Sequence, residues 1–196
     1  MNENQENLRL FGSSPGKLPA YSHAATHLAE VLCERNIGLV YGGAAVGVMG
    51  AVANAVLDAG GEAIGVIPRS LAVKEVAHDN LTQLHVVASM HERKAMMAEL
   101  SDGFIALPGG WGTLEEIFEM LTWAQLGFHG KPCGLLNIEG YYDRLIAFLE
   151  SSFEQQFVKD VCRPMLMQAD EPAVLLDQFV SYRAPKVRKW VAEDEL

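Results

Sequence analysis

Positively charged residues and cysteines are both scarce in this sequence. Lysine and arginine together number 15 against 25 aspartate and glutamate residues, which gives a formal net charge of −10. This balance argues against a broad basic surface for binding a nucleic-acid polymer. The three cysteines, Cys33, Cys133 and Cys162, lack the spacing of metal ligands, and an odd number cannot all form disulfides. We therefore expect a reduced, cytoplasmic protein without a metal ion or other cofactor.

Targeting and membrane-spanning segments are also missing. Residues 1–7 are polar and acidic and contain no apolar region of the kind found in a secretory signal. The segment Asn36–Leu57 carries no charge over 22 residues, which is long enough to cross a bilayer. It contains five glycines and begins with a β-rich stretch, Ile37–Tyr41. A strand, a glycine turn and a buried helix explain it better than a membrane span does.

Short apolar runs alternate with longer helical patterns along the chain. The runs are continuously apolar, as in Phe104–Leu107, which is typical of parallel strands covered on both faces. The expected fold is therefore α/β: a Rossmann-like doubly wound parallel sheet with helices on both faces. The expected strands are Leu8–Phe11, Ile37–Tyr41, Ala63–Ile67, Leu84–Val87, Phe104–Leu107 and Cys133–Leu136; the expected helices are Pro19–Arg35, Gly47–Ala59, Met90–Leu100, Leu114–Leu126, Tyr142–Gln156 and Ala173–Val180.

No linker, repeat or low-complexity segment divides the chain. We expect residues 1–196 to form a single nucleotide-binding domain of this Rossmann-like type, with residues 1–7 and 185–196 as loose tails. In such a sheet, ligands bind at the carboxyl ends of the strands. Three glycine-rich or polar loops are predicted there: Gly12-Ser13-Ser14, Gly42-Gly43, and the six residues from Pro108 to Thr113.

The loop Pro108-Gly109-Gly110-Trp111-Gly112-Thr113 is the strongest functional signal. Its three glycines allow a ligand to approach the backbone closely, and a predicted helix N-terminus with free N–H groups follows it. The pattern predicts a binding site for an anion, and Glu116 is the candidate catalytic carboxylate. A purely structural alternative exists, because Thr113-x-x-Glu116 also has the spacing of a helix capping box.

A second helix start carries two adjacent cations. Ser89-x-x-Glu92 has capping-box spacing, and Arg93 and Lys94 follow in the first turn, where positive charge opposes the helix dipole. Such a broken local rule is expected at functional sites. An anionic ligand would balance both charges, although a solvated pair of cations is the structural alternative.

Other motifs point less clearly to chemistry. Gly12–Gly16 has the spacing of a hydrolase nucleophile elbow, but Pro15 lacks the N–H that an oxyanion hole requires. The same segment is one residue short of a phosphate-binding P-loop. Gly42–Gly50 is not a dinucleotide fingerprint, but its helix start could hold a phosphate. His23 and His27 are four residues apart on one expected helix, but no carboxylate or cysteine completes a ligand set with them, so they do not predict a metal site.

With M-H-x-R-K at Met90–Lys94 and P-G-G-x-G-T-x-E-E at Pro108–Glu116, the chain resembles the LONELY GUY (LOG) family, formerly described as possible lysine decarboxylases. The similarity runs from about Leu8 to Val180. Further blocks that carry it are Phe11–Ser14, Tyr41-Gly42-Gly43, Gly65–Pro68, Thr122–Gly127, Lys131-Pro132 and Gly140-Tyr141-Tyr142. Phe11 replaces a frequent cysteine, and Ala44 replaces a third glycine.

The resemblance implies hydrolysis of the N-glycosidic bond of purine nucleoside 5′-monophosphates, either cytokinin riboside 5′-monophosphates or AMP, with release of free base and ribose 5-phosphate. It further implies a homodimer with Arg93 and Glu116 as catalytic residues. The residues expected to bind substrate are Gly12, Ser13, Ser14, Gly42, Gly43, Met49, Glu75, Arg93, Lys94, Pro108, Gly109, Gly110, Trp111, Gly112, Thr113, Glu116 and Thr122. Which role Arg93 and Glu116 each take does not follow from the sequence.

Two alternatives remain open. A non-catalytic carrier of a nucleotide or of molybdenum cofactor would share the fold and the glycine loops. A pyridoxal-phosphate decarboxylase would need a Schiff-base lysine, for which Lys94 is the only plausible residue. Its position beside Arg93 favours phosphate binding instead.

Overall fold

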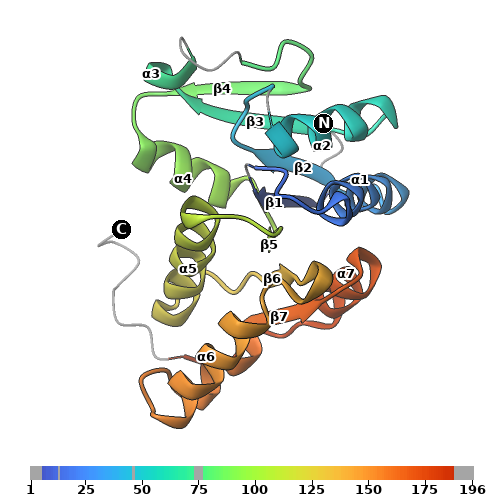
Figure 1. Ribbon diagram of the computed structural model, residues 1–196. Coiled ribbons are helices and arrows are strands. Elements are labelled where there is room, and N and C mark those ends of the chain that lie inside the picture. Colours follow the sequence, from blue (N-terminus) through green and yellow to red (C-terminus); the bar gives the residue numbers. More distant parts are fainter. Residues whose placement is uncertain (1–5, 13, 46, 73–76, 188–196) are drawn as a thin grey trace.

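The computed structural model describes residues 6–12, 14–45, 47–72 and 77–187. These residues form a seven-stranded parallel sheet with the strand order β4-β3-β2-β1-β5-β6-β7 (Figure 1). The strands are β1 (Asn7–Phe11), β2 (Gly38–Tyr41), β3 (Ala63–Pro68), β4 (Gln83–Val87), β5 (Gly103–Ala106), β6 (Cys133–Leu136) and β7 (Leu166–Ala169). The doubly wound α/β fold expected from the sequence is confirmed.

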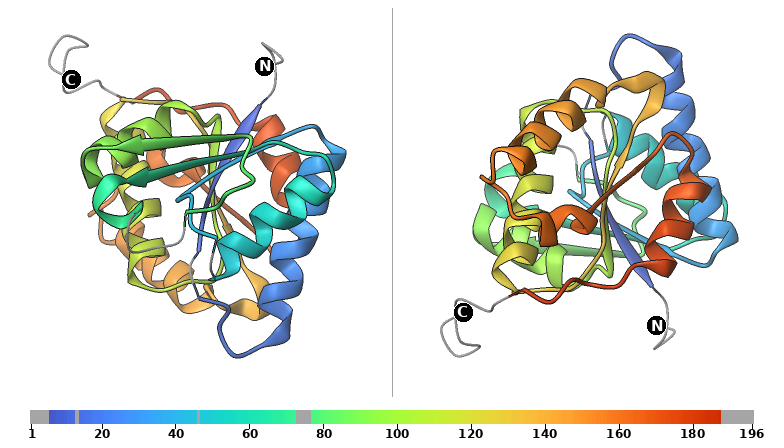
Figure 2. Two further views of the ribbon diagram at one scale, coloured as in Figure 1. Left: turned by 90° about the horizontal axis from the view of Figure 1, so that it is seen from above. Right: turned by 90° about the horizontal axis from the view of Figure 1, so that it is seen from below.

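Helices cover both faces of the sheet (Figures 1 and 2). One face is covered by α1 (Pro19–Glu34), α2 (Gly47–Asp58) and α7 (Pro172–Ser181), and the other by α4 (Met90–Glu99), α5 (Trp111–Leu126) and α6 (Asp143–Glu154). The short helix α3 (Arg69–Ala72) follows β3, and the 3₁₀ helices η1 (Ile138–Gly140) and η2 (Asp160–Met165) flank α6. The strand order reverses next to β1, so the loops after β1, β2 and β5 lie together at the carboxyl edge.

Several elements differ from the sequence expectation, among them the 3₁₀ helices η1 and η2, which were not predicted. Strand β7 was not predicted, because Leu166–Ala169 contains no β-branched or aromatic residue and lies at the sheet edge, where only its pairing with β6 defines it. Helix α3 was also missed. Helix α5 begins at Trp111, three residues before the predicted Leu114, because its N-cap is Gly110. Of the expected tails, residues 1–5 and 188–196 lie outside the described residues, and Asn7 belongs to β1 rather than to a tail.

His129 supplies a pH-dependent contribution to the stability of the sheet. Its ring lies beside Phe104 of β5; Nε2 donates to the Met120 carbonyl at 2.9 Å, and Nδ1 accepts from the Lys131 N–H at 3.1 Å. This arrangement requires the neutral ring. Burial lowers the pKa of His129 from 6.5 to about 4, with a smaller opposing effect of the Met120 carbonyl.

We expect His129→Gln to remove part of the acid sensitivity of folding. As the pH falls from about 6.5 to about 4, the unfolded wild-type chain binds a proton that the folded chain excludes, so its stability falls across this window. The loss is about 1–3 kcal/mol. Urea unfolding at pH 7.0 and 4.5 measures it, with the exposed His23→Gln as the control. An equal loss in wild type and His129→Gln would contradict the assignment.

Candidate active site

A cavity of about 290 Å³ opens at the carboxyl edge of the sheet, where β1 and β2 end. It contains five of the residues expected from the sequence to bind substrate: Gly12, Gly42, Met49, Arg93 and Glu116. Leu10, Tyr41, Ala44, Gly47, Leu71 and Met97 complete the lining. The structure thus brings together residues from the loops after β1 and β2 and from helices α2, α4 and α5. They meet at the edge of the sheet where the strand order reverses.

Glu116 reaches this cavity from the second turn of α5. The N-cap of α5 is Gly110, which makes no side-chain cap, and Thr113 is buried within the first turn. Glu116 Oε1 instead forms ion pairs with Arg9 Nη2 at 3.1 Å and with Arg93 Nη1 at 3.7 Å. The alternative of a capping box formed by Thr113 and Glu116 is therefore wrong. The Glu116 side chain is 17% exposed, so its carboxylate can meet a ligand in the cavity.

Arg93 approaches the same cavity from the first turn of α4. The predicted cap of this helix is confirmed: Ser89 Oγ accepts from the Glu92 N–H at 3.1 Å, and Glu92 Oε2 accepts from the Ala88 N–H at 2.7 Å. Arg93 Nε donates to the Val66 carbonyl at 3.0 Å, which directs its guanidinium toward β2. A Cβ atom at Gly42 would lie 2.2 Å from Arg93 Nη2. Glycine at this position therefore makes room for the guanidinium.

Gly42→Ala is expected to lower kcat/KM about tenfold while the protein still folds. The added methyl group forces the guanidinium of Arg93 to move, which weakens its ion pair with Glu116 in the cavity. Thermal unfolding separates this effect from loss of fold, because the neighbouring atom belongs to the end of a flexible side chain. Unchanged kinetics would show that the guanidinium position is unimportant.

Lys94 points toward α5 rather than into the cavity of Glu116. Its Nζ lies 2.8 Å from Glu115 Oε1 and 2.8 Å from Glu119 Oε1. Burial acts to lower the pKa of Lys94, but the two carboxylates outweigh it and the pKa lies above its ordinary value. A protonated, doubly paired lysine is poorly suited to forming a Schiff base. The two cations that oppose the dipole of α4 are thus balanced by carboxylates of α5.

The glycine loop before α5 is anchored by two consecutive tyrosines. Tyr141 donates its hydroxyl to the Gly109 carbonyl at 2.6 Å, and Tyr142 donates to the Leu107 carbonyl at 2.5 Å. A Cβ atom at Gly109 would lie 2.2 Å from Thr113 Oγ1, so the loop packs directly on the first turn of the helix. These contacts hold the free N–H groups of the helix start in a fixed place, as anion binding requires.

The remaining expected residues are more dispersed. Ser13 and Glu75 lie outside the described residues. Ser14 is exposed, and Trp111 is 91% exposed beside the glycine loop. Gly43 adopts a left-handed φ of +78° and packs on Ile67 and Leu84. Thr122 is exposed on α5 and lines a separate apolar cavity with Phe118 and Leu149. It does not line the cavity of Glu116.

Sequence reasoning missed two polar side chains at the site. Arg9 is fully buried beneath Glu116, and the signal was a charge inside the apolar run Leu8–Phe11. Tyr41 lines the cavity, and its buried hydroxyl has no hydrogen-bond partner within the described ranges. Burial raises the pKa of Tyr41, so its hydroxyl stays protonated and available as a donor.

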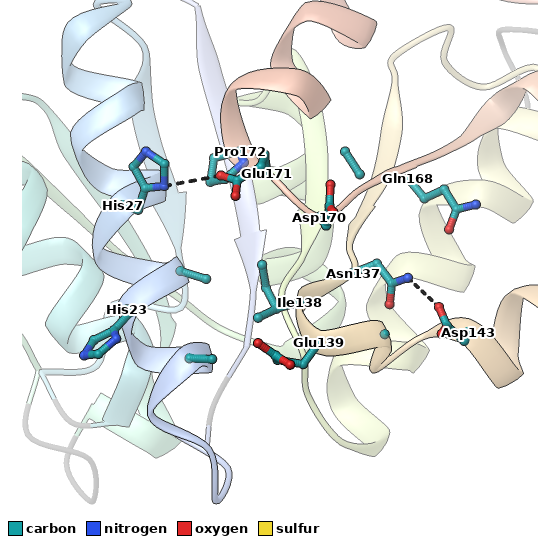
Figure 3. A pocket seen from close by; sticks show the side chains of 14 residues that line it. His23, His27, Asn137, Ile138, Glu139, Asp143, Gln168, Asp170, Glu171 and Pro172 are labelled. Carbon is teal, nitrogen blue, oxygen red and sulfur yellow. Dashed lines mark hydrogen bonds and ion pairs between the residues drawn. The ribbon is translucent and has the colours of Figure 1, made fainter.

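A larger cavity, of about 860 Å³, lies between α1 and the ends of β6 and β7 (Figure 3). It contains none of the expected substrate-binding residues. His27 pairs there with Glu171 at 3.7 Å, and Asn137 with Asp143 at 2.8 Å.

The parts of the chain that the structure describes contain no group of three or more histidine, cysteine, aspartate or glutamate residues able to hold a metal ion. Their helices include none with the length and apolarity needed to cross a membrane.

The parallel sheet and the cavity at its strand reversal are those of a Rossmann-like α/β protein. A family model described as "Possible lysine decarboxylase" matches residues 49–179. A probable cytokinin riboside 5′-monophosphate phosphoribohydrolase of Oryza sativa subsp. japonica, LOGL6, is 48% identical over 171 residues, or 87% of this chain and 68% of that protein. LOG5 of Arabidopsis thaliana, a cytokinin riboside 5′-monophosphate phosphoribohydrolase, is 48% identical over 172 residues, or 88% and 75%. The chain belongs to the LONELY GUY family.

Solved structures confirm the fold. The molybdenum cofactor binding protein of Rippkaea orientalis is 23% identical, with a TM-score of 0.69 over 91% of this chain and 98% of that one. The molybdenum cofactor carrier protein of Chlamydomonas reinhardtii is 19% identical, with a TM-score of 0.68 over 91% and 99%. At this level of identity, the similarity concerns the fold alone.

Proposed function

We propose that this protein hydrolyses the N-glycosidic bond of cytokinin riboside 5′-monophosphates and releases the free base and ribose 5-phosphate. The names of the relatives that are about half identical support this activity. In this chain itself, the activity is supported by the ion pair of Glu116 with Arg93, which lies in the cavity one turn from the glycine loop. A cofactor carrier needs an anion site but has no need of a carboxylate aimed at its ligand.

The chemistry follows from the charges at the site. The phosphate of the nucleotide binds the N–H groups at the start of α5, and the ribose extends toward Glu116. As the bond between C1′ and the base breaks, positive charge develops on the sugar, and the carboxylate stabilises it and orients the attacking water. The oxygen of the attacking water bonds to C1′, the electron pair of the broken bond leaves with the base, and the proton that the water loses balances the proton that the base gains. Arg93 binds the nucleotide beside Glu116.

The test is direct. Purified protein is incubated with N6-isopentenyl-AMP and, separately, with AMP, and free base and ribose 5-phosphate are quantified. We expect release from the cytokinin nucleotide, and the ratio of the two kcat/KM values defines the base preference. Absence of release from both nucleotides at high enzyme concentration would refute the proposal. Tight binding without turnover would favour the carrier.

The position of Thr122 supports a homodimer as part of this proposal. Thr122 lies outside the cavity of its own chain, on the exposed side of α5 beside an apolar cavity of about 180 Å³. If it contacts substrate, a second copy of the chain must bring it there. We place the reaction in the cytoplasm, since the three cysteines are unpaired.

A further inference from the structure

Arg9 is a charged residue in the interior of the sheet, where its neighbours on the adjacent strands are apolar. It lies in β1, in register between Val40 of β2 and Phe104 of β5, both of which are fully buried. Its side chain lies on the face of the sheet covered by α4 and α5 and is 0% exposed. Burying a charge in the middle of a sheet is costly unless a partner of opposite charge accompanies it.

The partner of Arg9 is the carboxylate that faces the cavity. Arg9 Nη2 lies 3.1 Å from Glu116 Oε1, while Nη1 donates to the Lys94 carbonyl at 3.3 Å. The guanidinium carbon also lies 4.6 Å from the centre of the Phe11 ring. Within the described ranges, neither Nε nor Nη2 of Arg9 makes a hydrogen bond, so the contact of Nη2 with Glu116 is an ion pair only. The guanidinium is therefore incompletely satisfied, and Glu116 provides its counter-charge.

The two arginines hold Glu116 in a defined orientation. Arg9 contacts Oε1 from beneath, inside the core, and Arg93 contacts the same oxygen at 3.7 Å from the cavity wall. Among the described residues, both ion pairs of Glu116 end on Oε1, and Oε2 takes part in neither of them. An apolar side chain would fill the place of Arg9 at a lower desolvation cost, so its charge does more for the site than for the core.

We propose that Arg9 is a positioning residue that fixes the rotamer of Glu116 for hydrolysis of the nucleotide, an inference that rests on the proposed function. Arg9 is completely buried and does not itself touch the substrate. Its removal therefore changes kcat rather than KM.

The test compares Arg9→Met, which keeps most of the volume, with Arg9→Lys, which keeps the charge. We expect Arg9→Met to lower kcat about tenfold to thirtyfold with KM within about threefold, and Arg9→Lys to recover most of the loss. Arg35→Met is the matched control, because it removes an arginine from the α1–α7 ion pair with Asp177, and its kcat stays at the wild-type value. Thermal unfolding verifies that each variant is folded. A wild-type kcat for Arg9→Met, or a folded Arg9→Lys no faster than Arg9→Met, would overturn the proposal.

A double-mutant cycle distinguishes positioning from a general structural effect. In the Glu116→Gln background, Arg9→Met should change the residual rate by less than about threefold, because the carboxylate through which Arg9 acts is gone. An undiminished effect there would overturn the proposal. The same cycle measured by urea unfolding should show coupling between Arg9 and Glu116 without reference to activity. If the wild type releases no base, the proposed function fails, and the unfolding cycle alone decides whether Arg9 holds Glu116.

Discussion

Glu116→Gln is expected to lower kcat about a thousandfold while KM stays within about threefold. The amide keeps the size of the carboxylate but removes the negative charge that faces the developing charge on the sugar. The ion pairs with Arg9 at 3.1 Å and Arg93 at 3.7 Å are lost together with that charge. Single-turnover release of base from N6-isopentenyl-AMP measures the effect even when the rate is very low.

Glu150→Gln is the matched control for this variant. Glu150 is also a carboxylate paired with an arginine, Arg163, but both are exposed and lie away from the cavity. We expect wild-type kinetics for Glu150→Gln. If Glu116→Gln were as active as this control, the carboxylate would have no part in the chemistry, and the proposed mechanism would be wrong.

Glu116→Gln also has a consequence for folding. It leaves the guanidinium of Arg9 buried without its counter-charge, which typically costs about 3–5 kcal/mol for a fully buried pair. Arg9→Met in the same protein removes the unpaired charge and is expected to restore part of the stability. The kinetic effect of Glu116→Gln must therefore be read at a temperature well below the unfolding midpoint of the variant.

The layout of the sheet and the edge that carries the site could be predicted from the sequence. Continuous apolar runs such as Phe104–Leu107 identify parallel strands, and loops after parallel strands meet at one edge. Glu116 could be singled out because three glycines precede it, a pattern with little use in a simple helix cap. These inferences rest on local residue types, and the structure brings Gly12, Gly42 and Arg93 to the same cavity as Glu116.

The balance of charges at the site could not be read from the sequence. The pairing of Arg9 with Glu116 joins residues 107 positions apart, and it depends on which face of β1 meets α5. The pairing of Lys94 with Glu115 and Glu119 likewise depends on how α4 packs beside α5. The start of α5 was misplaced for a local reason: Thr113 has the side chain of a good N-cap, but Gly110 takes the extended backbone of that position.

Arg93→Met is expected to lower kcat/KM about a hundredfold. The guanidinium is held by the Val66 carbonyl at 3.0 Å and lies against Gly42, so its charged end faces the cavity beside Glu116. Methionine keeps much of the length but offers neither charge nor N–H groups to the nucleotide. Steady-state release of base measures the change, and Arg35→Met controls for loss of an arginine elsewhere.

The sequence leaves the role of Arg93 open. Whether Arg93→Met raises KM or lowers kcat distinguishes its two possible roles. If Arg93 mainly binds the phosphate, Arg93→Met should raise KM and weaken product inhibition by ribose 5-phosphate in parallel. If it acts where the bond breaks, kcat should fall and the inhibition constant of ribose 5-phosphate should stay within about threefold. The ion pair of Arg93 with Glu116 favours the second outcome, because the start of α5, where we propose that the phosphate binds, lies one turn away from that carboxylate. If folded Arg93→Met had the kcat/KM of the wild type, Arg93 would have no role in substrate binding or catalysis.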